Sequence, residues 1–79
     1  MRYNYDKLRG RIREKRMSET GLARAIGLSA SALSLKLNGK IAFTQTDIGA
    51  CMDVLDIGKG DVADYFFCES TNKMLVNDG

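Results

Sequence analysis

The stretch SETGLARAIGLSASALSLKLNGK, residues 18–40, predicts two short helices joined by a tight turn. Ser18 and Ser29 stand where each helix would begin, and a serine hydroxyl there accepts a hydrogen bond from a backbone N–H of the first turn. Gly27 lies between them, where a residue with positive φ reverses the chain without a Cβ clash. We therefore expect helices over about residues 19–26 and 30–37.

The rest of the chain has further helical patterns and no proline. Leu8 and Ile12 stand one helical turn apart, and Thr44 to Asp47 has the residue types of a capping box. Asp61 precedes an aromatic run and can cap a last short helix. With the two helices above, the pattern predicts an all-α fold of five helices, the other three over about residues 6–16, 45–55 and 62–67.

The length of 79 residues corresponds to one small domain, near the lower limit for a core without disulfides or metals. We expect this domain over residues 1–69, followed by a flexible or docked C-terminal tail over residues 70–79. The apolar residues of the tail are Met74, Leu75 and Val76. No apolar run is long enough to span a membrane, and the first residues lack the apolar segment of a secretory signal. A cytoplasmic protein without a membrane partner is expected.

The chain has few of the residue types that catalysis and metal binding require. It has no histidine, which removes the commonest general base and zinc ligand. Its two cysteines, Cys51 and Cys68, lack the spacing of a metal or redox motif and are expected to be small buried or half-buried residues. We therefore expect no enzyme, no cofactor and no metal site.

Charge is distributed unevenly along the chain. Residues 1–40 carry a net charge of +7 and residues 41–79 a net charge of −5, although the whole chain has only +2. A basic half of this kind is typical of a protein that meets a polyanion, while the acidic half is kept away from it. The alternative is that both halves are ordinary solvated surfaces.

The stretch of residues 18–40 resembles the helix-turn-helix of the phage Cro/CI repressor family. The positions that match are Ser18, Leu22-Ala23, Gly27-Leu28-Ser29, Leu33 and Asn38-Gly39-Lys40. FTQTDIGACMDVLDI (residues 43–57) and YFF (residues 65–67) also resemble small Cro-like phage regulators, so the resemblance covers about residues 5–67. It implies a compact five-helix lambda-repressor-like DNA-binding domain, with the helix-turn-helix at the second and third helices.

In this type of docking, the third helix lies in the major groove with its N-terminal residues against base edges. The expected base-reading residues are Ala30, Ser31, Ala32, Ser34 and Leu35. None of them can make the bidentate contact that arginine or glutamine makes with a base, so modest base readout is expected. The alternative is that Ser31 and Ser34 are simply solvated. Glu19 also departs from the family, because glutamine is common there and a carboxylate would repel a phosphate.

Phosphate contacts are expected from cationic and amide side chains around this helix, namely Arg9, Arg13, Arg16, Arg24, Lys36, Asn38 and Lys40. Lys36 is placed at the free edge of the helix, because Leu33 and Leu37 form its apolar face. Asn38 also suits a purely structural role as the C-cap of the helix.

The second half of the chain carries more large apolar residues than a small core needs. Those expected at a dimer interface are Met52, Leu55, Ile57, Tyr65, Phe66 and Phe67. A homodimer, at least on DNA, would let two helix-turn-helix units read two half-sites. The alternative is that these residues close the core of a single chain. Tyr3 and Tyr5 suit either use.

The sequence thus predicts a sequence-specific transcriptional regulator whose partner is a double-stranded DNA operator. The alternative is a protein-interaction module on the same fold, such as an antirepressor or an antitoxin-like partner. The weak base-reading set leaves this alternative open.

Overall fold

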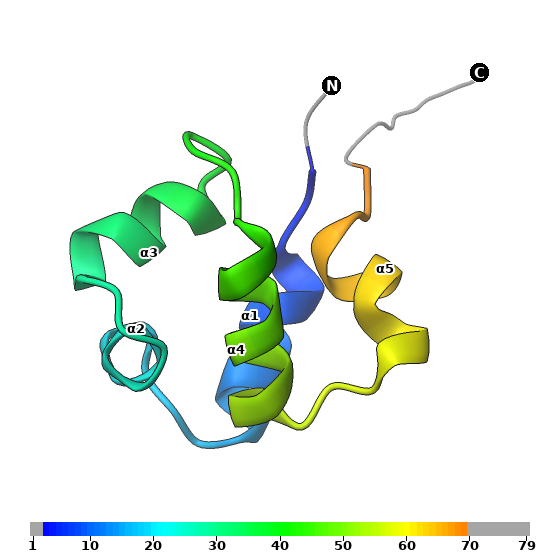
Figure 1. Cartoon of the computed structure of the whole chain (residues 1–79), viewed down its shortest axis with the longest axis horizontal. Coiled ribbons are helices and arrows are strands. Elements are labelled where there is room, and N and C mark those ends of the chain that lie inside the picture. The colour runs from blue at the N-terminus through cyan, green and yellow to red at the C-terminus, as the bar shows by residue number, and fades with distance from the viewer. Residues whose placement is uncertain (1–2, 70–79) are drawn as a thin grey trace.

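The computed structural model describes residues 3–69 of the chain. This part folds into five α-helices joined by short loops (Figure 1). They are α1 (Asp6–Glu14), α2 (Glu19–Ala25), α3 (Ala30–Leu37), α4 (Gln45–Leu55) and α5 (Val62–Phe66), and a 3-10 turn, η1 (Lys59–Asp61), leads into α5. The predicted all-α fold is confirmed, because these residues hold one isolated β-bridge and no strand. The expected tail, residues 70–79, lies outside the described residues. Between residues 3 and 69, no helix has the length and apolar character that crossing a membrane requires.

Helices α2, α3 and α4 each begin directly after the N-cap residue that the sequence predicts, namely Ser18, Ser29 and Thr44. The hydroxyls of Ser18 and Ser29 each accept a hydrogen bond from a first-turn N–H, at 2.9 and 3.0 Å. Thr44 and Asp47 form a complete capping box, in which each side chain accepts the backbone N–H of the other at 3.0 Å. Each bond satisfies a backbone donor that the helix itself leaves unpaired.

Left-handed residues end or follow four helices. Gly27 after α2 has a φ of 81°, as its place in the turn predicts, and Gly39 after α3 has a φ of 75°. Arg16 and Asp56 adopt φ values of 58° and 56°, which are uncommon for residues with a side chain. Helix α1 therefore ends at Glu14, two residues before the expected end.

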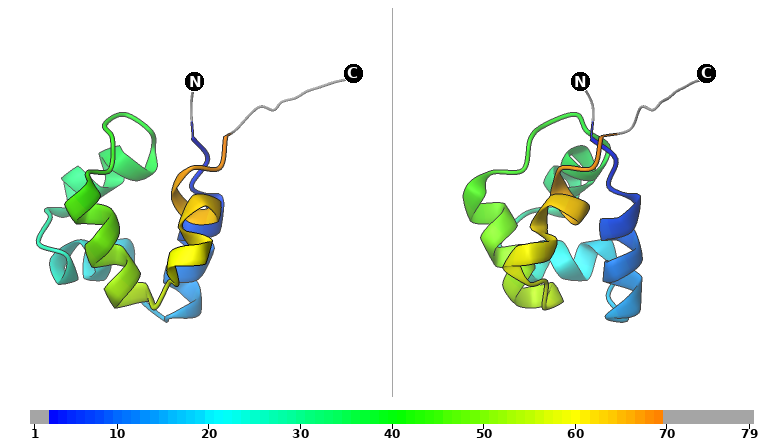
Figure 2. Two further views of the ribbon diagram at one scale, coloured as in Figure 1. Left: turned by 45° about the vertical axis from the view of Figure 1, so that its right-hand side comes forward. Right: turned by 90° about the vertical axis from the view of Figure 1, so that its right-hand side faces the viewer.

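The core lies where the helices meet, with α1 against α5 and α2 against both α3 and α4. Figure 2 shows α1 and α5 side by side, on the opposite side of the molecule from α2 and α3. The largest fully buried side chains come from every helix and include Leu8, Ile12, Leu22, Leu33, Leu55 and Phe66. The core therefore draws on almost the whole described length.

Half of the residues expected at a dimer interface belong to this core instead. Leu55, Ile57 and Phe66 are only 0%, 6% and 2% exposed, so their assignment to a dimer interface is wrong. Met52 and Tyr65 are half-buried and pack against the core, whereas Phe67 is 49% exposed. The connection between α4 and α5 contacts α1 through Arg11, and the buried side chains pack in the core of a single chain.

Arg11 joins the first helix to the end of the fourth. Its Nε donates to the backbone oxygen of Leu55 at 3.0 Å, and its Nη2 donates to that of Asp56 at 3.1 Å. The last carbonyls of a helix have no partner within the helix, and a cation also suits its negative end. Arg11 thus holds together segments 44 and 45 residues apart in the sequence.

The two cysteines differ in exposure, and this difference predicts different reactivity. Cys51 is buried, whereas Cys68 is exposed, contrary to the expectation that both would be covered. Burial, together with the charge of Asp47, raises the pKa of the Cys51 thiol to about 11, so this thiol stays protonated in mildly alkaline buffer.

We expect Ellman's reagent to modify Cys68 alone in the folded chain and both cysteines after denaturation. Rapid modification of Cys51 in folded Cys68→Ser protein would contradict this expectation.

Candidate functional site: the outer surface of helix α3

The expected base-reading residues all lie at the surface of α3. Ala30, Ser31 and Leu35 are exposed, and Ala32 and Ser34 are half-buried. Ser31 and Leu35 stand one helical turn apart and therefore share a face. This outer surface is made of small and apolar side chains, with Leu35 its largest member at 45% exposure.

Lys36 does not lie at the edge of this surface, and the expectation that it is free to meet a phosphate is wrong. Its side chain is buried, with Nζ 2.7 Å from a carboxylate oxygen of Asp47 and 2.9 Å from the backbone oxygen of Ala42. The loop between α3 and α4 folds back, so that the first turn of α4 faces the last turn of α3. Lys36 therefore fixes this loop in place.

The environment of Asp47 keeps its carboxylate charged. Burial by itself raises the pKa of Asp47, but the hydrogen bonds from Lys36 and from the backbone and hydroxyl of Thr44 outweigh it, and the net pKa is lowered. A charged carboxylate is the form that both the lysine and the capping box require.

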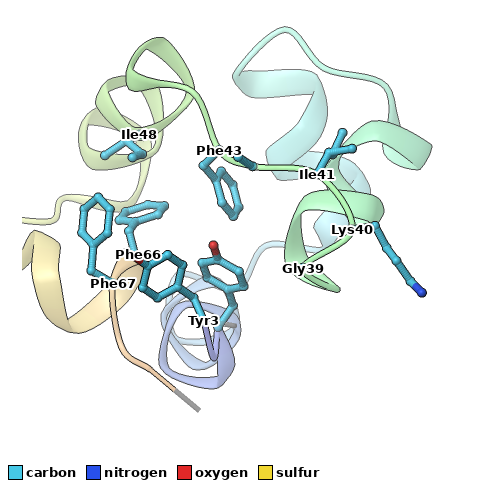
Figure 3. Close-up of a pocket in the computed structure, with 10 residues that line it drawn as sticks. Tyr3, Gly39, Lys40, Ile41, Phe43, Ile48, Phe66 and Phe67 are labelled. Carbon is cyan, nitrogen blue, oxygen red and sulfur yellow. The ribbon is translucent and has the colours of Figure 1, made fainter. Parts of the chain in front are cut away.

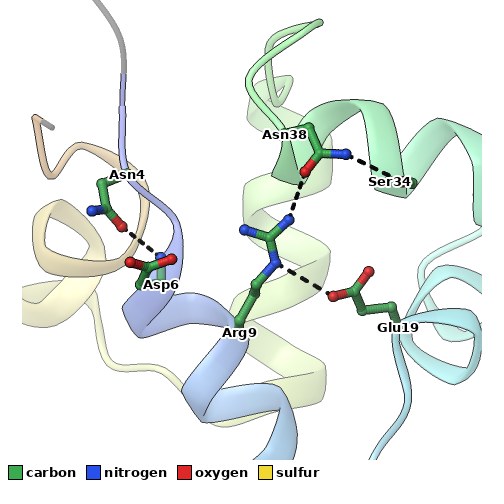
Figure 4. Close-up of polar contacts among 6 residues, drawn as sticks. All are labelled: Asn4, Asp6, Arg9, Glu19, Ser34 and Asn38. Atoms are coloured by element: carbon green, nitrogen blue, oxygen red, sulfur yellow. Dashed lines mark hydrogen bonds and ion pairs between the residues drawn. The ribbon is translucent and has the colours of Figure 1, made fainter.

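Arg9 and Asn38 also contact each other, as Figure 4 shows. Nη2 of Arg9 donates to Oδ1 of Asn38 at 2.9 Å, and its Nε lies 3.4 Å from a carboxylate oxygen of Glu19. Nδ2 of Asn38 lies 3.5 Å from the hydroxyl of Ser34. Because α1, α2 and α3 each contribute to this group, both expected phosphate ligands are already engaged in holding three helices together.

The other expected phosphate ligands are exposed. Arg13, Arg16, Arg24 and Lys40 make no ion pair within residues 3–69. Arg13 and Arg16 lie together at the end of α1, where the backbone N–H of Arg16 donates to the oxygen of Arg13 at 2.9 Å. Lys40 lies just beyond α3. Of the expected phosphate ligands, these four side chains are available to an anionic partner.

Next to Leu35 lies an apolar residue that the sequence reasoning missed. The backbone N–H groups of Lys40 and Ile41 both approach the oxygen of Leu35, at 2.9 and 3.4 Å, which places Ile41 beside the end of α3. Ile41 is 45% exposed. The signal was available in the apolar residues Ile41 and Phe43, which follow directly after the Asn-Gly-Lys ending.

Comparisons with known proteins identify the family of the chain and a similar solved structure. The chain has no match among curated proteins. Among solved structures, it is similar to the solution structure of the modulator of repression (MOR) of the temperate bacteriophage TP901-1 from Lactococcus lactis. The two sequences are 39% identical, the TM-score is 0.73, and the match covers 85% of this chain and 90% of that one. The expected likeness to a phage regulator is thereby confirmed. The family model described as "Protein of unknown function (DUF739)" matches residues 1–69, and the chain belongs to this family.

Proposed function

We propose that this protein regulates phage gene expression by binding another protein, a repressor, through the outer surface of α3. The likeness to a modulator of repression supports a role in the control of repression. The observation that carries the proposal is the chemistry of α3, where exposed Leu35 lies among small side chains and exposed Ile41 follows just after the helix, its backbone N–H donating to the oxygen of Leu35. Apolar surface that stays exposed in a small domain is typical of a protein contact.

The same surface lacks the side chains that read DNA bases. Bidentate readout needs arginine, lysine, asparagine or glutamine directed at base edges. On α3 and at its C-cap these types are represented by Lys36 and Asn38, of which one is buried and the other is bonded to Arg9. A repressor surface that accepts Leu35 is therefore a better partner for α3 than the major groove.

Operator binding is the second candidate function, and a separate group of residues supports it. Two short helices with a glycine turn between them, as in the Cro/CI resemblance, suit a helix-turn-helix, and the exposed Arg13, Arg16, Arg24 and Lys40 suit phosphate contacts. A homodimer would be needed for reading two half-sites. Binding of this kind would rest on phosphates and would weaken steeply as salt is raised.

Leu35→Glu is expected to weaken binding to the repressor encoded by the same phage by about 30-fold, the effect of losing a central apolar contact. Isothermal titration of the two purified proteins measures this affinity. Because Leu35 is exposed, the fold is retained. Ala63→Glu adds the same charge to the exposed surface of α5 and is the matched control, expected to leave the affinity unchanged.

Two results would contradict the proposal. One is equal repressor affinity of the Leu35→Glu and natural proteins. The other is the absence of repressor binding, together with a salt-dependent shift of operator DNA that is lost in an Arg13→Ala/Arg16→Ala/Arg24→Ala variant. The second result would establish operator binding instead.

A further inference from the structure

An open groove lined mostly by aromatic and aliphatic residues lies between the α3–α4 loop and the two ends of the described chain (Figure 3). In this view Ile41 stands on one side and Tyr3, Phe67 and Ile48 on the other, with Phe43 between them. The groove has a volume of about 480 Å³. Three of the four large hydrophobic side chains exposed within residues 3–69 therefore line one groove.

The walls of this groove are held in place by aromatic and backbone contacts. Tyr3 and Phe67 meet edge to face with ring centroids 5.7 Å apart, and Phe43 meets Phe66 in the same way at 5.3 Å. The backbone N–H of Asn4 donates to the oxygen of Cys68 at 2.6 Å. An aromatic groove with fixed walls can accept apolar side chains without first rearranging.

The described chain ends at the edge of this groove. Glu69 forms a β-bridge with Tyr3, which is itself a wall residue. Ten residues follow in the sequence, and their only large apolar side chains are the consecutive Met74, Leu75 and Val76. Met74 lies five residue steps after Glu69, a length of chain that can span about 17 Å when extended. The apolar part of this segment can therefore reach the groove from its attachment point.

We propose that Met74, Leu75 and Val76 pack into this groove as an intramolecular cover over Ile41 and Phe67. Attachment at Glu69 gives the segment a high effective concentration at the groove, so that a weak apolar contact is sufficient. The apolar gain is opposed by the entropy lost when the segment is ordered, and the two are similar in size. The cover is therefore reversible. If the proposed repressor contact at Leu35 extends to Ile41, the cover competes with the repressor; this consequence alone rests on the proposed function.

Methyl NMR of the full chain tests the cover directly. We expect nuclear Overhauser effects between the ε-methyl of Met74 and the δ1-methyl of Ile41. Replacing Met74, Leu75 and Val76 together by serine is expected to shift the methyl signals of Ile41 and Ile48 but not that of the buried Ile12. Asn72→Ser/Asn77→Ser changes the same segment outside its apolar part and is the matched control, expected to shift neither groove signal.

Several outcomes would overturn the proposal. One is the absence of a contact between Met74 and the groove, together with unchanged Ile41 and Ile48 signals in the triple-serine variant. A second is groove signals that change only with protein concentration, which would identify a second copy as the occupant. A third is groove signals that change only when the repressor is added, which would assign the groove to the repressor and leave the proposed function intact. The titration of Leu35→Glu tests that function separately.

Discussion

Lys36→Met is expected to lower the free energy of unfolding by about 3 kcal/mol, since removing one member of a buried ion pair leaves the other charge uncompensated. The carboxylate of Asp47 would remain in a buried position without the ammonium that now lies 2.7 Å away. The backbone oxygen of Ala42 would also lose its donor, which loosens the loop between α3 and α4. Chemical denaturation followed by circular dichroism measures the effect.

Two further variants separate the ion pair from the loss of a lysine as such. Lys36→Met/Asp47→Asn removes both charges and keeps an amide oxygen for the capping box, so it is expected to recover most of the loss. Lys40→Met makes the same change at an exposed position and is expected to cost less than about 0.5 kcal/mol. Equal stability of the Lys36→Met and Lys40→Met proteins would contradict a buried pair.

The Lys36–Asp47 pair is also expected to make the stability of the protein depend on pH in the acidic range. Because the pKa of Asp47 is lowered in the folded chain, its contribution to stability is complete above the ordinary value of 3.8. That contribution is lost as the pH falls through the lower value of the folded state. The Lys36→Met protein lacks the ammonium whose hydrogen bond contributes most to lowering the pKa of Asp47, so it should show a smaller loss of stability over this acidic range.

Phe66→Ala is expected to lower the free energy of unfolding by about 4 kcal/mol, because it removes a fully buried ring and leaves a cavity. Phe66 is 2% exposed and its ring meets that of Phe43. The adjacent Phe67→Ala, at a side chain that is 49% exposed, should cost about 1 kcal/mol or less and is the matched control. Denaturation at two protein concentrations should give the same midpoint for the natural chain.

A concentration-dependent midpoint would show that the folded chain associates with a second copy, because the stability of a dimer depends on protomer concentration. If Phe66→Ala leaves too little folded protein to measure, Phe66→Leu provides a milder test, with an expected loss of about 1 kcal/mol. Its loss should still exceed that of Phe67→Leu. Equal losses at the two positions would show that the core does not depend on Phe66.

The sequence predicts the helices well because their starts depend on local chemistry. Ser18, Ser29 and Thr44 each accept a hydrogen bond from the backbone N–H three residues later. Both partners of each bond therefore lie within one short stretch of sequence. The turn at Gly27 is predictable for the same reason, since a positive φ favours one residue type. The prediction of an all-α fold followed from these local features.

The site could be predicted less well because its residues are paired across the chain. Lys36 is a surface lysine by its helical position, and only the return of the loop brings Asp47 to it. Asn38 bonds to Arg9, 29 residues earlier, and no local pattern indicates that pair. Counting apolar residues also led to the wrong assignment of Leu55 and Phe66, because the count does not show that both side chains are buried in the core of one chain.

The contacts between the two ends of the domain determine when the protein can fold during translation. Leu8 and Ile12 of α1 are buried in the same core as Phe66 of α5, and Arg11 finds its acceptors only after residue 56 has been added. A ribosome that still holds α5 therefore carries a chain whose apolar side chains remain accessible to chaperones and proteases. Each chain is expected to complete its fold only after α5 has left the ribosome, and a premature stop codon within α5 would yield a product that the cell degrades.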